Sequence, residues 1–233
     1  MKRFFILLVA TVSLFASIEA NKKSKILSID KKEATIEKVN APIGSSGVVI
    51  HHFDKEHATI VAGVELIEPN RVRFTMFNAL KQESLPTPNI LPKVNDEVIL
   101  NYLYDRGVVI APNFKTYEEI VKKHPEIEWV HPDLFAAQLS QYQNPAPTKK
   151  DFQDFCNKYA VGIVYFAIES NGFFVDCQSF KKVARETITK KGVEIQLPFY
   201  SRIKEIETSW LNFYGSGEIT NYDNYYNNLM ESR

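Results

Sequence analysis

The sequence predicts an α+β protein in which a β-rich small barrel or sandwich is followed by a mixed α/β domain with a disulfide. Short β-branched and aromatic runs fill the chain up to about Pro112, whereas helical spacings alternate with strand-like runs after it. The chain has only two cysteines, Cys156 and Cys177, and both lie in the later part. We therefore expect domains at residues 21–113 and 114–233.

The first twenty residues have the pattern of a secretory signal peptide. Lys2 and Arg3 form a basic start, the run Phe4–Phe15 is mostly apolar, and Ala16 and Ala20 offer two cleavage sites. A membrane anchor is the alternative, although a spanning helix needs about 20 apolar residues. We therefore expect export, to the periplasm or to the outer cell surface, with the first 20 residues acting as the signal.

Seven runs in the first part are typical of strands, because β-branched and aromatic residues gather between Gly, Pro, Asn and Asp. The apolar residues of Arg71–Met76 alternate and share one face. Proline lacks the amide donor, so the proline-rich segment Leu85–Pro92 cannot be a central strand. The expected strands are Lys25–Ile29, Ala34–Val39, Gly47–Phe53, Thr59–Leu66, Val72–Phe77, Val98–Leu103 and Val108–Ala111.

The second part is expected to mix helices with strands. Thr148 and Asp151 form a variant capping box, and Asp133 can cap the helix that follows it. Asn171-Gly172 is typical of a hairpin turn. The expected helices are Thr116–Lys123, Leu134–Ser140, Lys149–Tyr159 and Ser179–Ile188, and the expected strands are Ile127–Val130, Val161–Ile168, Phe173–Cys177, Val193–Leu197 and Ile203–Ile206.

The two cysteines are expected to pair, because an exported protein meets an oxidising environment. Helical spacing turns Cys156 inward with Phe152 and Phe155, and Cys177 ends a strand. The bond would close a loop of about 20 residues, which contributes about 3 kcal/mol in the chain-entropy model. A reactive thiol with a histidine base is the alternative, and no local motif supports it. The aromatic residues of Trp210–Met230 are expected to pack onto the domain, with a partner or sugar surface as the alternative.

Composition excludes some classes of partner. The chain has 28 basic and 28 acidic residues, and removal of the signal leaves 26 against 27. A charge near zero gives no long-range attraction to phosphate, which argues against nucleic acid. The chain after the signal contains no apolar run of 18 residues, so we expect no further membrane span.

The histidines are the candidates for metal or hydrolytic chemistry. His51, His52 and His57 lie near Asp54 and Glu56, and imidazole and carboxylate are proper metal ligands. On a strand, however, His51 and His52 point to opposite faces, which favours a solvated turn over a metal site. A second pair, His131 beside Asp133, could orient a base, but no nucleophile is tied to it by a motif. We therefore predict no metal, no cofactor and no catalytic residue.

Five phrases of the sequence are distinctive when they are taken in order: Gly47-Val48-Val49-Ile50, Leu85-Pro86-Thr87-Pro88, Leu103-Tyr104-Asp105-Arg106 with Ile110-Ala111-Pro112-Asn113, His131-Pro132-Asp133-Leu134-Phe135-Ala136, and Asp176-Cys177-Gln178-Ser179-Phe180. Together they resemble the N-terminal region of plasminogen-binding proteins. Those proteins are exported surface proteins of Helicobacter, Campylobacter and related bacteria, and the resemblance covers roughly residues 22–200.

The resemblance implies a non-enzymatic protein that captures host plasminogen through lysine side chains, which enter the lysine-binding pockets of kringle domains. Such a pocket pairs acids with the ammonium across an apolar trough. Lysine pairs are then the candidate anchors, and we rank Lys190-Lys191 first because Gly192 could place them on an exposed turn. The chain ends at Arg233 where the family uses a terminal lysine, and guanidinium fits an ammonium pocket less well. The candidate binding residues are Lys190, Lys191, Lys181, Lys182, Lys149, Lys150 and Arg233.

Two other functions are consistent with the sequence. A periplasmic structural module would scaffold an assembly of envelope proteins and never meet a host protein, and the missing terminal lysine favours it. An envelope hydrolase would use His51 with His57, or His131 with Asp133, and would require a deep polar pocket.

Overall fold

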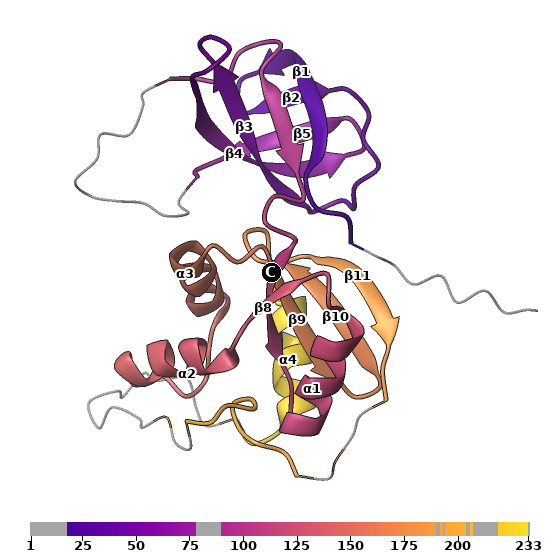
Figure 1. Ribbon diagram of the computed structural model, residues 1–233, viewed down its shortest axis with the longest axis vertical. Helices are drawn as coiled ribbons and strands as arrows, with labels where there is room; N and C mark the ends of the chain where they lie inside the picture. The colour runs from indigo at the N-terminus through magenta and orange to yellow at the C-terminus, as the bar shows by residue number, and fades with distance from the viewer. Residues whose placement is uncertain are drawn as a thin grey trace, which may run out of the picture.

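A computed structural model describes residues 18–77, 90–189, 192, 194–203, 206 and 219–232, and it contains two sheets (Figure 1). The first is a closed barrel, and the second is a five-stranded mixed sheet covered by helices. This arrangement confirms the predicted α+β class, and it shows that the β-rich first part is a barrel and not a sandwich. Most of the expected signal peptide, residues 1–17, lies outside the described residues, as do residues 85–89 of the proline-rich segment.

Six antiparallel strands close the barrel in the order β1-β2-β5-β4-β3-β6. Alternate residues point inward, so Ile26, Val49 and Val72 are fully buried in its core. β1 is bulged after Ile26 and pairs with β6 in its first half and with β2 in its second, which closes the ring. The strands are β1 (Lys22–Asp30), β2 (Glu33–Ile36), β3 (Ser46–His52), β4 (Ala58–Glu68), β5 (Arg71–Thr75) and β6 (Glu97–Leu100).

The chain leaves the barrel after β6. The strand expected at Val98–Leu103 ends at Leu100, and the backbone turns at Asn101 and Leu103, which both have positive φ. The strand expected at Val108–Ala111 is β7 (Arg106–Ile110), and it pairs in the second sheet. Sheet membership therefore changes between residues 100 and 106, ahead of the expected domain boundary at residue 113.

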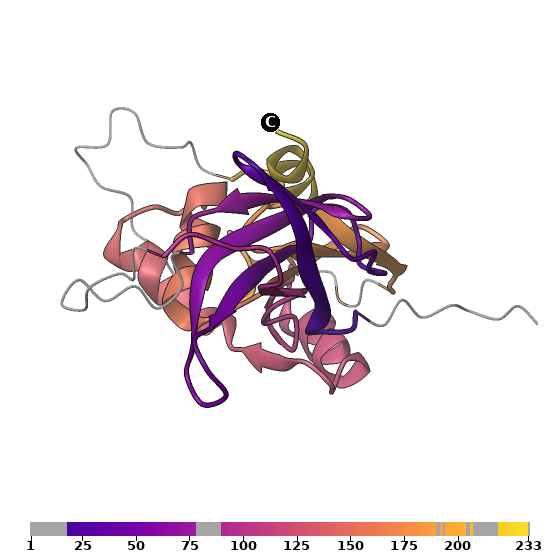
Figure 2. The ribbon, with the colours of Figure 1, turned by 90° about the horizontal axis from the view of Figure 1, so that it is seen from above.

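The second sheet has the order β11-β10-β9-β7-β8, with β7 parallel to both its neighbours. Every residue of β9 is buried, because helices cover both faces of the sheet. Figure 2 shows α4 and α1 on opposite sides. The remaining elements are β8 (Glu128–Val130), β9 (Ile163–Ile168), β10 (Asn171–Asp176), β11 (Lys182–Thr187), α1 (Phe114–Lys123), α2 (Pro132–Gln141), α3 (Lys149–Tyr159) and α4 (Tyr222–Glu231).

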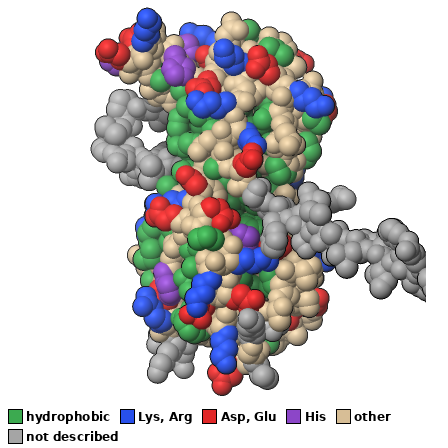
Figure 3. Space-filling view, turned by 45° about the vertical axis from the view of Figure 1, so that its right-hand side comes forward, with side chains coloured by type: hydrophobic (Ala, Val, Ile, Leu, Met, Phe, Trp, Pro, Cys, Tyr) green, Lys and Arg blue, Asp and Glu red, His purple; other side chains and the backbone are tan. Residues whose placement is uncertain are grey.

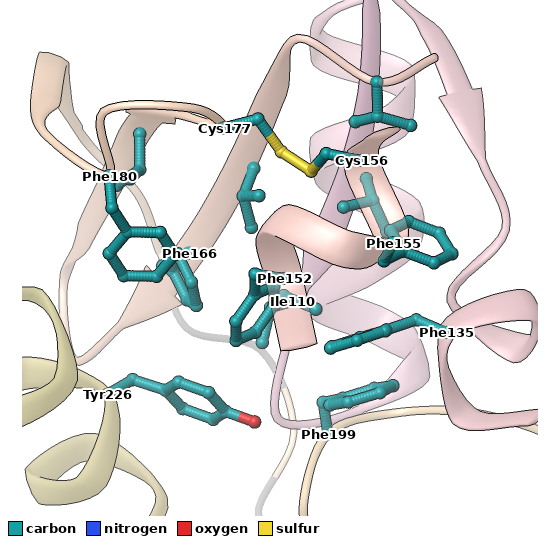
Figure 4. Packing of buried hydrophobic residues seen from close by; sticks show 14 of the residues in the cluster. Ile110, Phe135, Phe152, Phe155, Cys156, Phe166, Cys177, Phe180, Phe199 and Tyr226 are labelled. Atoms are coloured by element: carbon teal, nitrogen blue, oxygen red, sulfur yellow. A yellow bond between two sulfur atoms is a disulfide. The ribbon is translucent and has the colours of Figure 1, made fainter. Parts of the chain in front are cut away.

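The aromatic core lies on the face of the sheet covered by α2, α3 and α4 (Figure 4). The Phe135 and Phe199 rings stack at a centroid distance of 5.4 Å, and Phe152 of α3 packs edge-on against Phe166 of β9. Cys156 of α3 is disulfide-bonded to Cys177, directly after β10, and both are buried in this core. The predicted disulfide is therefore confirmed, together with its role of joining α3 to the hairpin.

The capping predictions have different outcomes. The capping box of Thr148 and Asp151 is present, and α3 has the predicted bounds. The predicted cap at Asp133 is wrong: the N-cap of α2 is His131, whose side chain accepts from the Asp133 amide. The carboxylate of Asp133 instead binds Arg202 from a later segment, a partner that local sequence cannot reveal.

Two further expectations in the second part are wrong. The helix predicted at Ser179–Ile188 is instead the strand β11, because its period-2 burial and its pairing with β10 override helix propensity. The hairpin turn is Glu169-Ser170 rather than Asn171-Gly172, since Asn171 already pairs with Ile168. Gly172 is needed for packing, because a Cβ there would lie 1.7 Å from the Tyr165 hydroxyl oxygen.

The described part of the C-terminal tail packs onto the domain, as predicted. Tyr222 and Tyr226 of α4 are fully buried, and their hydroxyls donate to the carbonyls of Ile110 and Pro198. Trp210–Gly217 lies outside the described residues, as do residues 193 and 204–205 of the two strands expected near this end. The described residues 194–197, 203 and 206 belong to no strand. Among the described helices, none has the length and apolar character needed to cross a membrane.

Candidate functional site

A buried carboxylate, that of Asp176, lies where the barrel meets the second sheet. Its Oδ2 accepts from the Ser46 amide at 2.8 Å, the Ser46 hydroxyl at 2.6 Å and the Tyr104 hydroxyl at 2.7 Å. Its Oδ1 accepts from the amides of Gln178 and Ser179 at 2.9 and 2.7 Å. The side chain has no exposed surface. Five donors therefore satisfy an acceptor-only group and join both sheets to the connection between them.

Neighbouring contacts hold the same junction. Burial, and then the charge of Asp176, raise the pKa of Tyr104 well above its usual range, so the phenol remains a donor. The Ser179 hydroxyl donates to the carbonyl of Gly44 at 2.6 Å. Gly44 has a φ of 92°, and a Cβ there would lie 2.7 Å from the Lys181 side chain. The loop before β3 is therefore fitted closely to the turn that follows β10.

Beside this junction, the two adjacent lysines of one candidate pair, Lys181 and Lys182, contact different parts of the protein. Lys181 reaches the barrel, where its Nζ lies 2.6 Å from Oε1 of Glu65. Lys182 begins β11 and points elsewhere: its Nζ lies 4.0 Å from Glu231 and 5.0 Å from the centre of the Phe173 ring. The adjacent lysines therefore do not form one binding feature.

The other described pair begins α3. Lys149 donates to the carbonyl of Ser232 and lies 5.3 Å from the centre of the Phe180 ring. Lys150 pairs with Asp154 one turn later, and its side chain is 78% exposed. The hydrogen bond that Lys150 donates to Asp154 raises the pKa of Lys150, so the ammonium form is favoured. Exposed pairs at this spacing are weak, so Lys150 is the most available of the four described candidates.

The structure thus brings Lys149 and Lys182 to the last turn of α4, but it does not gather all the candidates. Lys190, Lys191 and Arg233 lie outside the described residues. On the face shown in Figure 3, basic and acidic side chains are interspersed over both parts, without a large patch of one sign. Recognition through these lysines would therefore depend on individual ammonium groups.

Each of the three histidines that the sequence offered as metal ligands is paired with a carboxylate of the protein. Nδ1 of His51 lies 2.7 Å from Asp96, His52 pairs with Glu97, and His57 pairs with Asp54 inside the β3–β4 turn. Within the part of the chain that the structure describes, no group of three or more His, Cys, Asp or Glu side chains could hold a metal ion.

A second, partly buried polar cluster surrounds Glu186 of β11 and was not found from the sequence. Its Oε1 accepts from Tyr165 at 2.6 Å and lies 2.9 Å from Nε2 of His124, and its Oε2 lies 2.8 Å from Nζ of Lys123. Burial favours a raised pKa for Glu186, but hydrogen bonds from these three residues outweigh it and lower the pKa to about 2. Burial likewise favours a lowered pKa for His124, yet its bonds to Glu186 and Glu126 raise it above 6.5.

The fold and this site define a two-part α+β protein whose parts meet at a buried polar junction. A family model described as "Plasminogen-binding protein pgbA N-terminal" matches residues 21–230. The chain therefore belongs to this family, which confirms the resemblance seen in the sequence.

Two relatives are named "Plasminogen-binding protein PgbA", from Helicobacter pylori strains J99 and 26695. Each is 29% identical over 161 residues, which are 68% of this chain and 35% of the relative. The matched region thus spans about a third of the length of these relatives. No solved structure matches the chain.

Replacing Asp176 by Asn tests the junction. In either orientation, the NH2 group of the new amide faces N–H or O–H donors and cannot accept hydrogen bonds from them. We therefore expect the free energy of unfolding to fall by about 3 kcal/mol. Urea denaturation measures it, with the exposed Asp105→Asn as the matched control. Equal midpoints for the two variants would show that the five hydrogen bonds contribute nothing to stability.

The Glu186 cluster makes stability depend on pH. The pKa of His124 is raised in the fold, so its contribution is complete below about pH 6.5 and is lost as pH rises through the folded-state pKa. We expect His124→Gln to be destabilising at pH 5.5 and to approach the parent protein at pH 8.5 in urea denaturation. A stability difference that stays constant or grows toward pH 8.5 contradicts this reading.

Proposed function

We propose that this chain is an exported, non-enzymatic interaction protein that binds host plasminogen through lysine side chains. The observation that carries the proposal is the family match over residues 21–230, together with relatives named for plasminogen binding. The disulfide supports export, because such bonds persist in oxidising compartments. Residues 1–20 would direct the chain to the periplasm or the outer surface. The barrel and the second sheet would then form two domains.

In the proposed mechanism, an ammonium group enters a lysine-binding pocket of plasminogen. Lys150 is the most accessible described anchor, because binding would cost only its weak pairing with Asp154. Lys149, Lys181 and Lys182 would have to exchange contacts with Ser232, Glu65 and Glu231. Lys190, Lys191 and Arg233 remain proposed anchors from the sequence. No catalytic residue, metal or cofactor forms part of this mechanism.

A lysine analogue tests the mechanism directly. We expect 6-aminohexanoic acid to abolish binding of the disulfide-bonded protein to immobilised plasminogen in surface plasmon resonance, since it fills the same pockets. Lys150→Gln should weaken binding by about fivefold if this residue is an anchor. Lys122→Gln is the matched control, because Lys122 is also exposed and pairs at i,i+4 with Glu118. The Lys190→Gln/Lys191→Gln double variant tests the anchor pair ranked first.

Full binding in excess analogue would exclude lysine capture, whichever residue is changed. Equal losses for Lys150→Gln and Lys122→Gln would indicate a general charge effect and remove Lys150 as an anchor.

A second candidate function is a periplasmic structural module of the cell envelope with no host ligand. The observation that favours it is that each described candidate lysine already has an acidic or carbonyl partner within the protein. Surface proteolysis of intact cells distinguishes the two functions. If the chain is a periplasmic structural module, it should be protected from protease until the outer membrane is broken. If it captures host plasminogen, protease should digest it on intact cells.

A further inference from the structure

Four aromatic rings lie in a group of close pairwise contacts in the part of the protein that contains the second sheet. The Tyr117 ring centre lies 5.3 Å from those of both His131 and Tyr200, and the Phe114 and Tyr200 centres are 5.5 Å apart. His131 meets Tyr117 and Tyr200 edge-on, whereas Tyr200 is tilted against Phe114 and Tyr117. We call Phe114, Tyr117, His131 and Tyr200 the Tyr200 ring cluster.

Three chain segments build this cluster. Phe114 and Tyr117 belong to the first turn of α1, and His131 is the N-cap of α2. Tyr200 lies on a segment held beside the end of β7, where its amide donates to the carbonyl of Ala111 at 2.7 Å. The rings are therefore positioned by backbone and capping contacts, independently of any ligand.

A carboxylate at the cluster already holds a cation. Oδ2 of Asp133 lies 2.5 Å from Nε of Arg202, and its Oδ1 accepts from the Arg202 amide at 2.8 Å. The Asp133 side chain is only 19% exposed, whereas that of Arg202 is 71% exposed. The guanidinium thus reaches a half-buried acid from the solvent side, and the backbone bond would persist without it.

The charge states suit a cationic ligand. Burial lowers the pKa of His131, which keeps its ring neutral, and burial raises the pKa values of Tyr117 and Tyr200. Burial of Asp133 favours a raised pKa, but the hydrogen bonds from Arg202 outweigh it and lower the pKa. Neutral ring faces beside an ionised acid attract a planar cation.

Exposed apolar side chains accompany the cluster. In the described chain after residue 100, five large apolar or aromatic side chains are exposed, and four of them lie in the segments that build this surface. These four are Phe114, Leu134, Ile195 and Leu197. Exposed apolar side chains that gather in neighbouring segments are typical of a protein-binding surface.

We propose that the Tyr200 ring cluster and Asp133 form a binding site for an arginine side chain of a partner protein, with Arg202 as the internal occupant in the free protein. Arginine is favoured over lysine because its planar guanidinium stacks on rings and can engage a carboxylate through two N–H groups. The site is independent of the proposed plasminogen function, in which this chain supplies the cation instead of accepting it.

An NMR titration tests the proposal on the disulfide-bonded protein. The probe is Nα-acetyl-arginine amide, and Nα-acetyl-citrulline amide is its neutral isostere. We expect shifts of the Tyr117, Asp133 and Tyr200 signals with the arginine probe, and binding weaker by about fivefold with the citrulline probe. Tetramethylammonium, a rounded cation without N–H donors, should bind less well than arginine.

Two variants sharpen the test. Arg202→Gln removes the internal competitor and should tighten probe binding by about threefold, whereas Arg185→Gln, which removes a distant exposed arginine that binds Asn171, should not. Asp133→Asn should weaken binding by about fivefold, and unchanged amide spectra elsewhere would show that it folds. Equal binding of arginine and citrulline, stronger binding of tetramethylammonium, or an Arg202→Gln variant that binds no better would each overturn the proposal.

Discussion

The carboxylate of Asp176 is the contact on which the arrangement of the two parts depends. It is fully buried, and among the described residues no basic side chain forms an ion pair with it. It accepts hydrogen bonds from β3, from the connection after β6 and from the turn after β10. A buried ionised group is tolerated only when hydrogen bonds replace its hydration. Because Ser46 and Tyr104 lie 130 and 72 residues before Asp176 in the sequence, the carboxylate is satisfied only when barrel and sheet are docked.

The disulfide and the junction support each other through adjacent residues. Cys177 follows Asp176 directly and is bonded to α3, so the turn that supplies the Gln178 and Ser179 amides is tied to the aromatic core. The same turn leads to Lys181 and Lys182, which diverge toward the barrel and toward α4. The positions of these lysines are therefore fixed by the fold, while Lys150 stands apart on the exposed start of α3.

Much of the fold could be predicted from the sequence, because its signals are local. β-Branched and aromatic runs between turn residues located the barrel strands, the Thr148–Asp151 capping box gave the start of α3, and the expectation of an oxidising compartment gave the disulfide. The errors arose where contacts with distant residues determine the local structure. β11 is a strand because it pairs with β10, and the Asp133 carboxylate binds Arg202 instead of capping its helix. Asp176 stood within a family phrase in the sequence, but its donors Ser46 and Tyr104 could not be assigned without the fold.

Amide hydrogen exchange at Ser46 tests the central claim most directly. This amide donates to Asp176 of the other sheet, so its protection reports docking of the two parts. The account predicts that Ser46 exchanges as slowly as Gln178 and Ser179, whose amides share the same carboxylate. Rapid exchange at Ser46 while the amides of β9 stay protected would show that the barrel moves freely on an intact second sheet, and would contradict it.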